Sequence, residues 1–540
     1  MYMNKFLISV ALTALLAGCT GGGFYSNDYD SVATSNPTDV QESLTYSTSL
    51  YGSDDGGPRA DIAVLLPTSG IAKSTGNDIK TSIETAFLRK PKSNIKISFF
   101  DVSGDASQRY AVMRQALSTH PDVVIGPLFA EDTRILRDMK PSGLPVISFT
   151  SDIQSLGNGV TTVNLIPRQS IETIVRQMQD DKRQGIVIFA PNNNAGESMT
   201  SVAYAAADLY DIPVHGVYYY DSGKSDSIKA VTHNASLYNV RNAVNTRARE
   251  VLSDILTKED LSAETHADLT EQLETISRTE TLGELPYDSI LFLGNGADSK
   301  TLASFLRYYG VSNRDVAFYG TTLWQDSDIN SDFTLSGAKY ATLPEISNNF
   351  VSLNNLVAGK NPGYLSAFGY DAANLALGMI FSQKSPSAYI FDPSGYIGAG
   401  GIFRIQPNGV SERALRIVEL NGSGTTKTVK ESAGNFLTPL YSIRSTNLKY
   451  VSPMEVKTRG INPGDYINIP EEFLKKSQYK TKKIGTSDTL TDSEPDTEQK
   501  NIVIPVQQSE ESEIISNPDY EPVKLETVSR KYIDSVEIQE

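Results

Sequence analysis

The chain has 540 residues, of which 64 are acidic and 48 are basic, so the formal net charge is −16. Neutralising the phosphates of nucleic acid requires a cationic face, so this acidic balance argues against nucleic acid as the main partner. Hydrophobic residues make up 39% of the chain and 39 residues are Gly, which together is ordinary for a globular protein with a sizeable core.

The first 19 residues have the features of a secretion signal. Lys5 forms a short basic region, an apolar run extends from Phe6 to Ala17, and small residues precede Cys19. A membrane-spanning helix is the alternative, but the run is shorter than the roughly 20 apolar residues that a span needs. The tetrapeptide LAGC (16–19) resembles the lipobox of bacterial lipoproteins, which implies that residues 1–18 are removed and that Cys19 is acylated.

Cys19 is the only cysteine in the chain. The exported protein therefore holds its fold by core packing, without an internal disulfide. Several acyl chains on one N-terminus give stable anchoring, which a single chain does not. Thr20 rather than Asp follows Cys19, and in the lipoprotein sorting pattern of many Gram-negative bacteria this implies an outer-membrane anchor facing the periplasm.

Both ends of the chain differ in composition from the middle. Residues 19–58 are rich in Ser, Thr, Asp, Gly and Tyr without an apolar period, which predicts a flexible tether. Residues 486–540 contain 14 acidic and four basic residues, which predicts a disordered acidic tail. Residues 443–485 form a C-terminal extension between the regular region and this tail.

Between these ends, residues 59–442 alternate apolar runs with helical stretches. Near-continuous apolar strands separated by amphipathic helices are typical of parallel sheets with helices on both faces. The expected strands lie at 61–67, 95–101, 122–127 and 144–150 in a first series, and at 185–190, 214–220, 288–294 and 315–320 in a second.

The two series predict an α/β protein with two lobes. We expect the first lobe to contain about 59–155 and 345–385, and the second about 156–344 and 386–442. A charged, helix-prone stretch without strands, about 239–283, predicts a helical insertion in the second lobe. Late elements that return across the boundary would make the multi-crossover hinge of clamshell binding proteins.

The combination of AVLLPTSG (63–70), DVVIGPLFAEDT (122–133) and LPVISFTSD (144–152) resembles the type I periplasmic-binding fold of Leu/Ile/Val-binding proteins. A narrower resemblance, to the LpoA-like penicillin-binding protein activators, covers about 59–442. The motifs that carry it are TLGELPYDSILFLGNG (281–296), YGTTLWQDSDI (319–329), FGYDAANLA (368–376) and GYIGAGGIFRIQPNGVSERALRIVEL (395–420).

That family implies regulation of peptidoglycan synthesis by direct contact with a class A penicillin-binding protein, without catalysis and without a cofactor. The best-known activator carries a long helical-repeat domain before the part that resembles a binding protein. Here a tether of about 40 residues takes that place, and a random coil of that length has a reach of about 35 Å.

Capture of a small polar solute for an ABC transporter is the alternative function. In the amino-acid-binding branch, hydroxyl groups after the third and fourth strands hold the ligand carboxylate. Phe129 or Ala130 stands where the first hydroxyl is expected, whereas Thr150 and Ser151 keep the second. The residues that we expect to line the cleft are Thr68, Ser69, Thr150, Ser151, Asn194, Asn295 and Trp324.

Other functional motifs are incomplete. The sequence contains no GxSxG elbow or HExxH helix, and its four His are widely separated. GNGADS (294–299) has Ser299 in place of the third Gly of a dinucleotide-binding loop. DSDINSD (326–332) has Ser331 at the Gly position of a calcium loop, with Gly337 in place of its bidentate Glu. The sequence therefore predicts no enzyme, no metal site and no cofactor.

Overall fold

The structure is a computed structural model that describes residues 47–50, 60–88, 95–258, 260–325, 328–443, 448–458 and 461–468. The predicted signal peptide, Cys19 and the acidic tail lie outside the described residues. Within the predicted tether, one strand is described: β1 (Ser47–Leu50), which pairs antiparallel with β3 (Ile95–Asp101). The sequence predicted no regular structure there. The pairing is possible because the edge of a sheet presents unpaired backbone groups to any extended segment.

The first lobe is built on a sheet with the order β1-β3-β2-β4-β5-β6, in which all strands except β1 run parallel. Burial along β2 is almost continuous, which confirms the prediction of strands covered on both faces. The remaining strands of this sheet are β2 (Ala60–Leu66), β4 (Val123–Ile125), β5 (Val146–Ser148) and β6 (Val160–Thr162).

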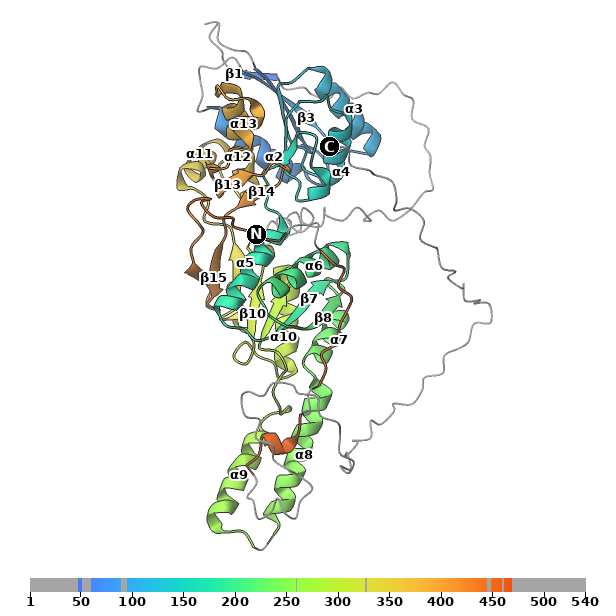
Figure 1. Cartoon of the computed structure of the whole chain (residues 1–540), viewed down its shortest axis with the longest axis vertical. Coiled ribbons are helices and arrows are strands. Elements are labelled where there is room, and N and C mark those ends of the chain that lie inside the picture. Colours follow the sequence, from blue (N-terminus) through green and yellow to red (C-terminus); the bar gives the residue numbers. More distant parts are fainter. Residues whose placement is uncertain are drawn as a thin grey trace, which may run out of the picture. The chain divides into compact units, whose positions relative to one another are not determined.

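Helices from two distant parts of the chain cover this sheet, and Figure 1 shows α2 and α12 side by side. Gly369 permits their close packing, because a Cβ at this position would lie 2.9 Å from Cγ2 of Ile79. The helices of the first lobe are α2 (Lys73–Leu88), α3 (Ala106–Ser118), α4 (Ala130–Met139), α11 (Asn348–Ala358), α12 (Tyr364–Phe381) and α13 (Pro386–Ile390).

The second lobe has a sheet with the order β16-β15-β11-β10-β9-β7-β8. Strands β8, β7, β9, β10 and β11 are parallel, and β15 and β16 extend the sheet in antiparallel pairs. Their bounds are β7 (Ile186–Pro191), β8 (Val214–Tyr220), β9 (Ser289–Phe292), β10 (Ala317–Gly320), β11 (Lys339–Thr342), β15 (Arg416–Leu420) and β16 (Thr426–Lys430). The helices that pack on this sheet are α5 (Pro167–Asp180), α6 (Asn194–Leu209), α7 (Ser225–Ala235) and α10 (Gly296–Tyr308).

The predicted helical insertion is confirmed as a hairpin of α8 (Tyr238–Leu256) and α9 (Ala263–Ser277). The hairpin has a small apolar core of its own, which includes Leu252 and Leu269. Ile467, from the C-terminal extension, completes that core. The extension is therefore part of the folded unit up to this point.

Three connections join the lobes, close to residues 163–166, 343–347 and 414–415. The expected lobe boundaries differ from the structure in two places. Both β6 and residues 386–413 fall within the expected second lobe. In the structure, β6 pairs with β5 of the first lobe, and residues 386–413 pack on α12 of the first lobe. The strands concerned have only three to five residues, too few for a periodic signal. The strands that follow α13 form a separate antiparallel sheet. They are β12 (Tyr396–Gly398), β13 (Gly401–Ile405) and β14 (Ser411–Arg413).

Candidate functional site between the lobes

A cavity of about 320 Å³ lies where the carboxyl ends of strands from both lobes meet. This is the position at which open parallel sheets bind ligands, because the strand-to-helix loops converge there. The first lobe contributes Ser151–Gln154 and the second lobe contributes loops after β7, β8 and β9. Leu448 of the C-terminal extension also lines the cavity.

Two of the predicted cleft residues, Ser151 and Asn295, line this cavity. Asn295 caps α10, since its Oδ1 accepts a hydrogen bond from the backbone N–H of Asp298 (2.9 Å). Its Nδ2 donates to the carboxylate of the same residue (3.0 Å). Asp298 also accepts hydrogen bonds from the hydroxyl of Ser222 and the N–H of Gly223. The polar groups of this loop are thus largely satisfied by one another.

Three predicted residues lie near the loops without lining the cavity. The backbone N–H of Thr68 donates to Asp101 (2.8 Å), and that of Ser69 donates to Ser103 (3.3 Å). Thr150 is buried, and its hydroxyl accepts the N–H of Asp152 (3.1 Å). These contacts shape the loops of the first lobe, and none of the three residues lines the cavity.

The remaining two predictions are displaced from the cavity. Asn194 is the first residue of α6, and its neighbour Asn193 lines the cavity and caps the helix instead. Trp324 is fully buried in the core of the second lobe, against the rings of Phe292 and Tyr340. Its indole N–H donates to the hydroxyl of Ser299 (2.9 Å), so it fills the core and does not line the cleft.

Arg168 is a charged lining residue that the sequence analysis did not single out. It is the second residue of α5, directly after the first connection between the lobes. Its Nε is buried and has no hydrogen-bond partner among the described residues. Burial lowers the pKa of its guanidinium, although the carboxylates of Glu172 and Glu412 oppose that shift. The helix start at Ile166-Pro167 is the only sequence signal that marks this position.

The other charged group at the cavity already has a partner. Asp152 forms an ion pair with Arg134 and accepts the hydroxyl of Ser155 (2.6 Å). Arg168 is thus the cationic group among the lining residues. The arrangement has the chemistry to hold a small anionic group. The two hydroxyl–carboxylate contacts there, Ser222 to Asp298 and Ser155 to Asp152, involve carboxylates that already bind the capping Asn295 or Arg134.

The incomplete motifs have structural roles. Ser299 of the GNGADS element accepts the Trp324 N–H inside the core, so no dinucleotide groove is open there. Asp332 of the acidic loop caps a short 3-10 turn by accepting the Thr334 N–H (2.9 Å), while Asp326 and Ser327 lie outside the described residues. Among the residues that the structure describes, no group of three or more His, Cys, Asp and Glu is placed to hold a metal ion. None of the described helices is long and apolar enough to cross a membrane.

Comparison with known proteins supports the resemblance found in the sequence. No family model matches the chain. Over 204 residues, the chain is 24% identical to the penicillin-binding protein activator LpoA of Pasteurella multocida. The match covers 35% of this chain and 35% of that protein, so it spans about a third of the relative's length.

The chain is also similar to solved structures. A candidate branched-chain amino acid ABC transporter protein from Rhodospirillum rubrum matches with a TM-score of 0.51 and 15% identity, over 69% of this chain and all of that one. The C-domain of LpoA from Haemophilus influenzae, described as a regulator of PBP1A, matches with a TM-score of 0.46 and 16% identity, over 68% of this chain and 100% of that chain. The chain therefore has a two-lobed type I periplasmic-binding fold and is similar, over part of its length, to the penicillin-binding protein activator LpoA.

Proposed function

We propose that the chain is a periplasm-facing lipoprotein, anchored in the outer membrane through Cys19, that binds and activates a class A penicillin-binding protein. The observation that carries this proposal is the similarity to LpoA over 204 residues. The lipobox, the export signal and the ordered motifs of residues 281–420 point in the same direction.

Activation in this proposal depends on surface contact and not on chemistry within the chain. The described residues hold their buried carboxylates in ion pairs and backbone hydrogen bonds, as at Asp371 and Glu412, instead of presenting them to a substrate. Charged groups used in this way stabilise and orient the chain, but they are not poised for general acid or base catalysis. The proposed role is regulation of peptidoglycan synthesis without an enzymatic step.

Glycan polymerisation by the class A penicillin-binding protein of the same organism tests the proposal. The rate is measured with and without the soluble chain that begins at Thr20, over a series of concentrations. We expect the rate to rise and to saturate at the concentration at which direct binding saturates. An active synthase that neither binds the chain nor changes its rate would contradict the proposal.

Capture of a small carboxylate solute is the second candidate, and Arg168 is the observation that favours it. Arg168 lines the 320 Å³ cavity, and a guanidinium in that position is suited to an anionic ligand. A ligand that binds only the folded state adds RT ln(1 + [L]/Kd) to the free energy of unfolding. Thermal stabilisation by amino acids or aromatic carboxylates, lost in Arg168→Gln, would support solute capture and could be measured in the same preparation.

A further inference from the structure

After β16 the chain returns to the junction between the lobes. Residues 440–443 cross this junction, and residues 448–456 continue along β8 of the second lobe. These two described stretches are called the strap below. The strap is separate in sequence from the three connections that join the lobes.

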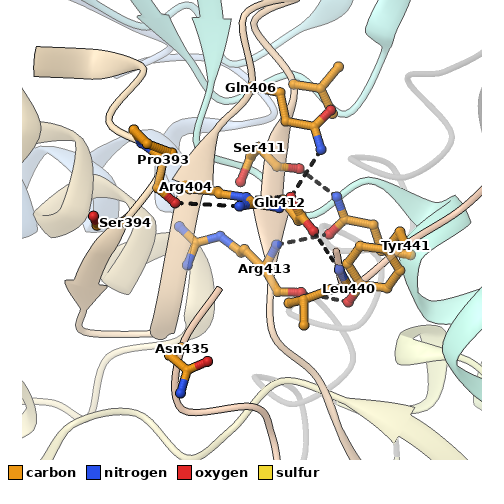
Figure 2. A network of polar contacts seen from close by, with 12 residues as sticks. Pro393, Ser394, Arg404, Gln406, Ser411, Glu412, Arg413, Asn435, Leu440 and Tyr441 are labelled. Atoms are coloured by element: carbon orange, nitrogen blue, oxygen red, sulfur yellow. Dashed lines mark hydrogen bonds and ion pairs between the residues drawn. The ribbon is translucent and has the colours of Figure 1, made fainter. Parts of the chain in front are cut away.

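On the side of the first lobe, the strap is held by β14. Glu412 is fully buried and accepts the backbone N–H of Leu440 (3.0 Å). The same carboxylate accepts hydrogen bonds from Arg404 (2.6 Å) and Gln406 (3.0 Å). The hydroxyl of Tyr441 donates to the carbonyl oxygen of the neighbouring Arg413 (2.6 Å). Figure 2 shows Glu412 between the side chains of β13 and the strap.

On the side of the second lobe, the strap is held by α5. Glu172 is fully buried, and its two carboxylate oxygens accept the backbone N–H groups of Ser442 (2.7 Å) and Ile443 (3.0 Å). Arg176 donates to the carbonyl oxygen of Leu440 (2.7 Å) and to Glu172 (3.2 Å). Four successive strap residues are therefore held in turn. Leu440 and Tyr441 bind β14 of the first lobe, and Ser442 and Ile443 bind Glu172 of the second lobe.

The second half of the strap lies along β8. The hydroxyl of Tyr219 donates to the carbonyl oxygen of Val451 (2.9 Å). Val217 and Met454 exchange two backbone hydrogen bonds of 3.0 and 3.1 Å. The N–H of Val456 donates to the hydroxyl of Tyr218 (3.0 Å). At the start of this half, Leu448 lines the cavity between the lobes.

Rotation of one lobe against the other would separate these contacts. A hinge closes when a few residues at the connections are free to absorb changes in backbone angle. Here the rotation would leave Glu172 or Glu412 buried with fewer hydrogen bonds, and a buried carboxylate without its partners is strongly unfavourable. Leu448 would also have to leave or enter the cavity as the cleft changed width.

We propose that the strap holds the two lobes at a fixed angle, so that the protein is a rigid two-lobed platform and not a clamshell that closes on a ligand. The inference goes beyond the proposed function and does not depend on it.

Distance measurement between the lobes by double electron–electron resonance tests the proposal. Spin labels are attached at Ala111→Cys in α3 and Ala230→Cys in α7, which are both exposed, in the chain that begins at Thr20 and therefore lacks Cys19, the only native cysteine. We expect one narrow distance distribution, unchanged by amino acids or aromatic carboxylates. A second population of label-to-label distances in the chain with an unsubstituted strap would overturn the proposal.

The strap is then weakened at its donors, leaving both carboxylates in place. Ser442→Pro removes the N–H that donates to Glu172, and Tyr441→Phe removes the hydroxyl that donates to Arg413. Loss of a hydrogen bond to a charged acceptor is expected to raise the population of other lobe angles roughly tenfold. Ala433→Pro is the matched control, because no hydrogen bond from its N–H is among those of the described residues. A double variant that stays folded and keeps the narrow distribution of the control would overturn the proposal.

Hydrogen exchange in the unsubstituted chain provides a second measurement in case the double variant does not fold. The amides of Leu440, Ser442 and Ile443 should exchange about as slowly as those of α5 and β14, because opening the strap requires breaking contacts to both. Exchange of these amides at the rate of the exposed residues 433–435 would overturn the proposal.

Discussion

Arg413 and Asp371 form an ion pair (Nη2–Oδ2, 3.1 Å) in which both side chains are completely removed from solvent. The guanidinium lies over the rings of Phe368 (4.0 Å) and Phe403 (4.7 Å), and its Nε donates to the carbonyl oxygen of Val163 (2.8 Å). Val163 belongs to the first connection between the lobes, and Arg413 itself precedes the third. One side chain therefore links two connections to α12.

Asp371→Ala is expected to destabilise the protein by about 3–5 kcal/mol, because it leaves the charge of Arg413 buried without its partner. The free energy of unfolding in urea measures the effect. Glu345→Ala is the control, since that carboxylate is exposed and its pair with Arg416 should contribute no more than about 1 kcal/mol. Equal losses in the two variants would contradict the conclusion that the buried pair of Arg413 and Asp371 stabilises the junction between the lobes.

The contacts of Asp181 predict that the protein loses stability in acid. Burial alone would raise its pKa, but hydrogen bonds from Lys339 (2.8 Å), Tyr319 (2.6 Å) and Gln177 (3.0 Å) outweigh burial and lower the pKa below its usual value. A carboxyl whose pKa is lower in the folded state stabilises the protein above its unfolded pKa, about 3.9. That contribution is lost as the pH falls toward the folded pKa.

The urea midpoint of Asp181→Asn should therefore be lower than that of the unsubstituted chain at pH 7, with the difference shrinking between about pH 5 and pH 3. Asp208→Asn, at an exposed position of α6, is the matched control and should follow the unsubstituted chain at each pH. A difference in urea midpoint between Asp181→Asn and the unsubstituted chain that stays the same at every pH would refute the link between the Asp181 pKa and stability.

The long strands could be predicted from the sequence because burial on both faces leaves a continuous apolar run, as in β2 and β7. The same reasoning predicted Ser151 and Asn295 near the cleft, since each follows a parallel strand of its lobe and such ends converge, and both line the cavity. Trp324 also follows a strand end, but an aromatic side chain there can turn either to the cleft or to the core. Its hydrogen bond to Ser299 and the neighbouring rings place it in the core.

The charged residues of the junction could not be predicted from local pattern. Glu172 lies on α5, whose sequence pattern is amphipathic and does not indicate that this carboxylate is buried. Its partners Ser442 and Ile443 lie some 270 residues later in the chain. Arg413 stands in the polar sequence SERALR, but the fold encloses it against Asp371, which is 42 residues away. Glu172 and Arg413 are both buried because of the way in which the lobes are joined. The periodicity of residues along one helix or strand contains no information about that arrangement.

Gly294 provides a test of packing beneath the cavity. A Cβ at this position would lie 1.9 Å from the hydroxyl of Tyr220, which is fully buried and has no hydrogen-bond partner among the described residues. Gly294→Ala should cost about 1–3 kcal/mol of unfolding free energy through overpacking. Tyr220→Phe alone should be close to neutral, because it removes an unsatisfied polar group.

The double variant Gly294→Ala/Tyr220→Phe should recover part of this loss, since the atom nearest the added methyl group is then the ring carbon at 3.2 Å. A double-mutant cycle from urea unfolding measures the coupling between the two positions. Additive effects, with no recovery in the double variant, would show that the clash is relieved elsewhere.

Ile467 tests whether the C-terminal extension holds the helical hairpin together. Its side chain is buried in the small core that α8 and α9 share, and the adjacent Tyr466 hydroxyl accepts the N–H of Glu284 (2.8 Å). Ile467→Ala should weaken this local core by about 2–4 kcal/mol, because a cavity opens where few neighbouring side chains can collapse. We expect amides of α8 and α9 to exchange faster while those of β7 and β9 stay protected, since the hairpin core is separate from the core of the sheet. Ile397→Ala is the matched control, as that side chain is 93% exposed and its removal should leave exchange in the hairpin unchanged. Faster exchange throughout the second lobe would instead mean that the hairpin and the sheet unfold as one unit.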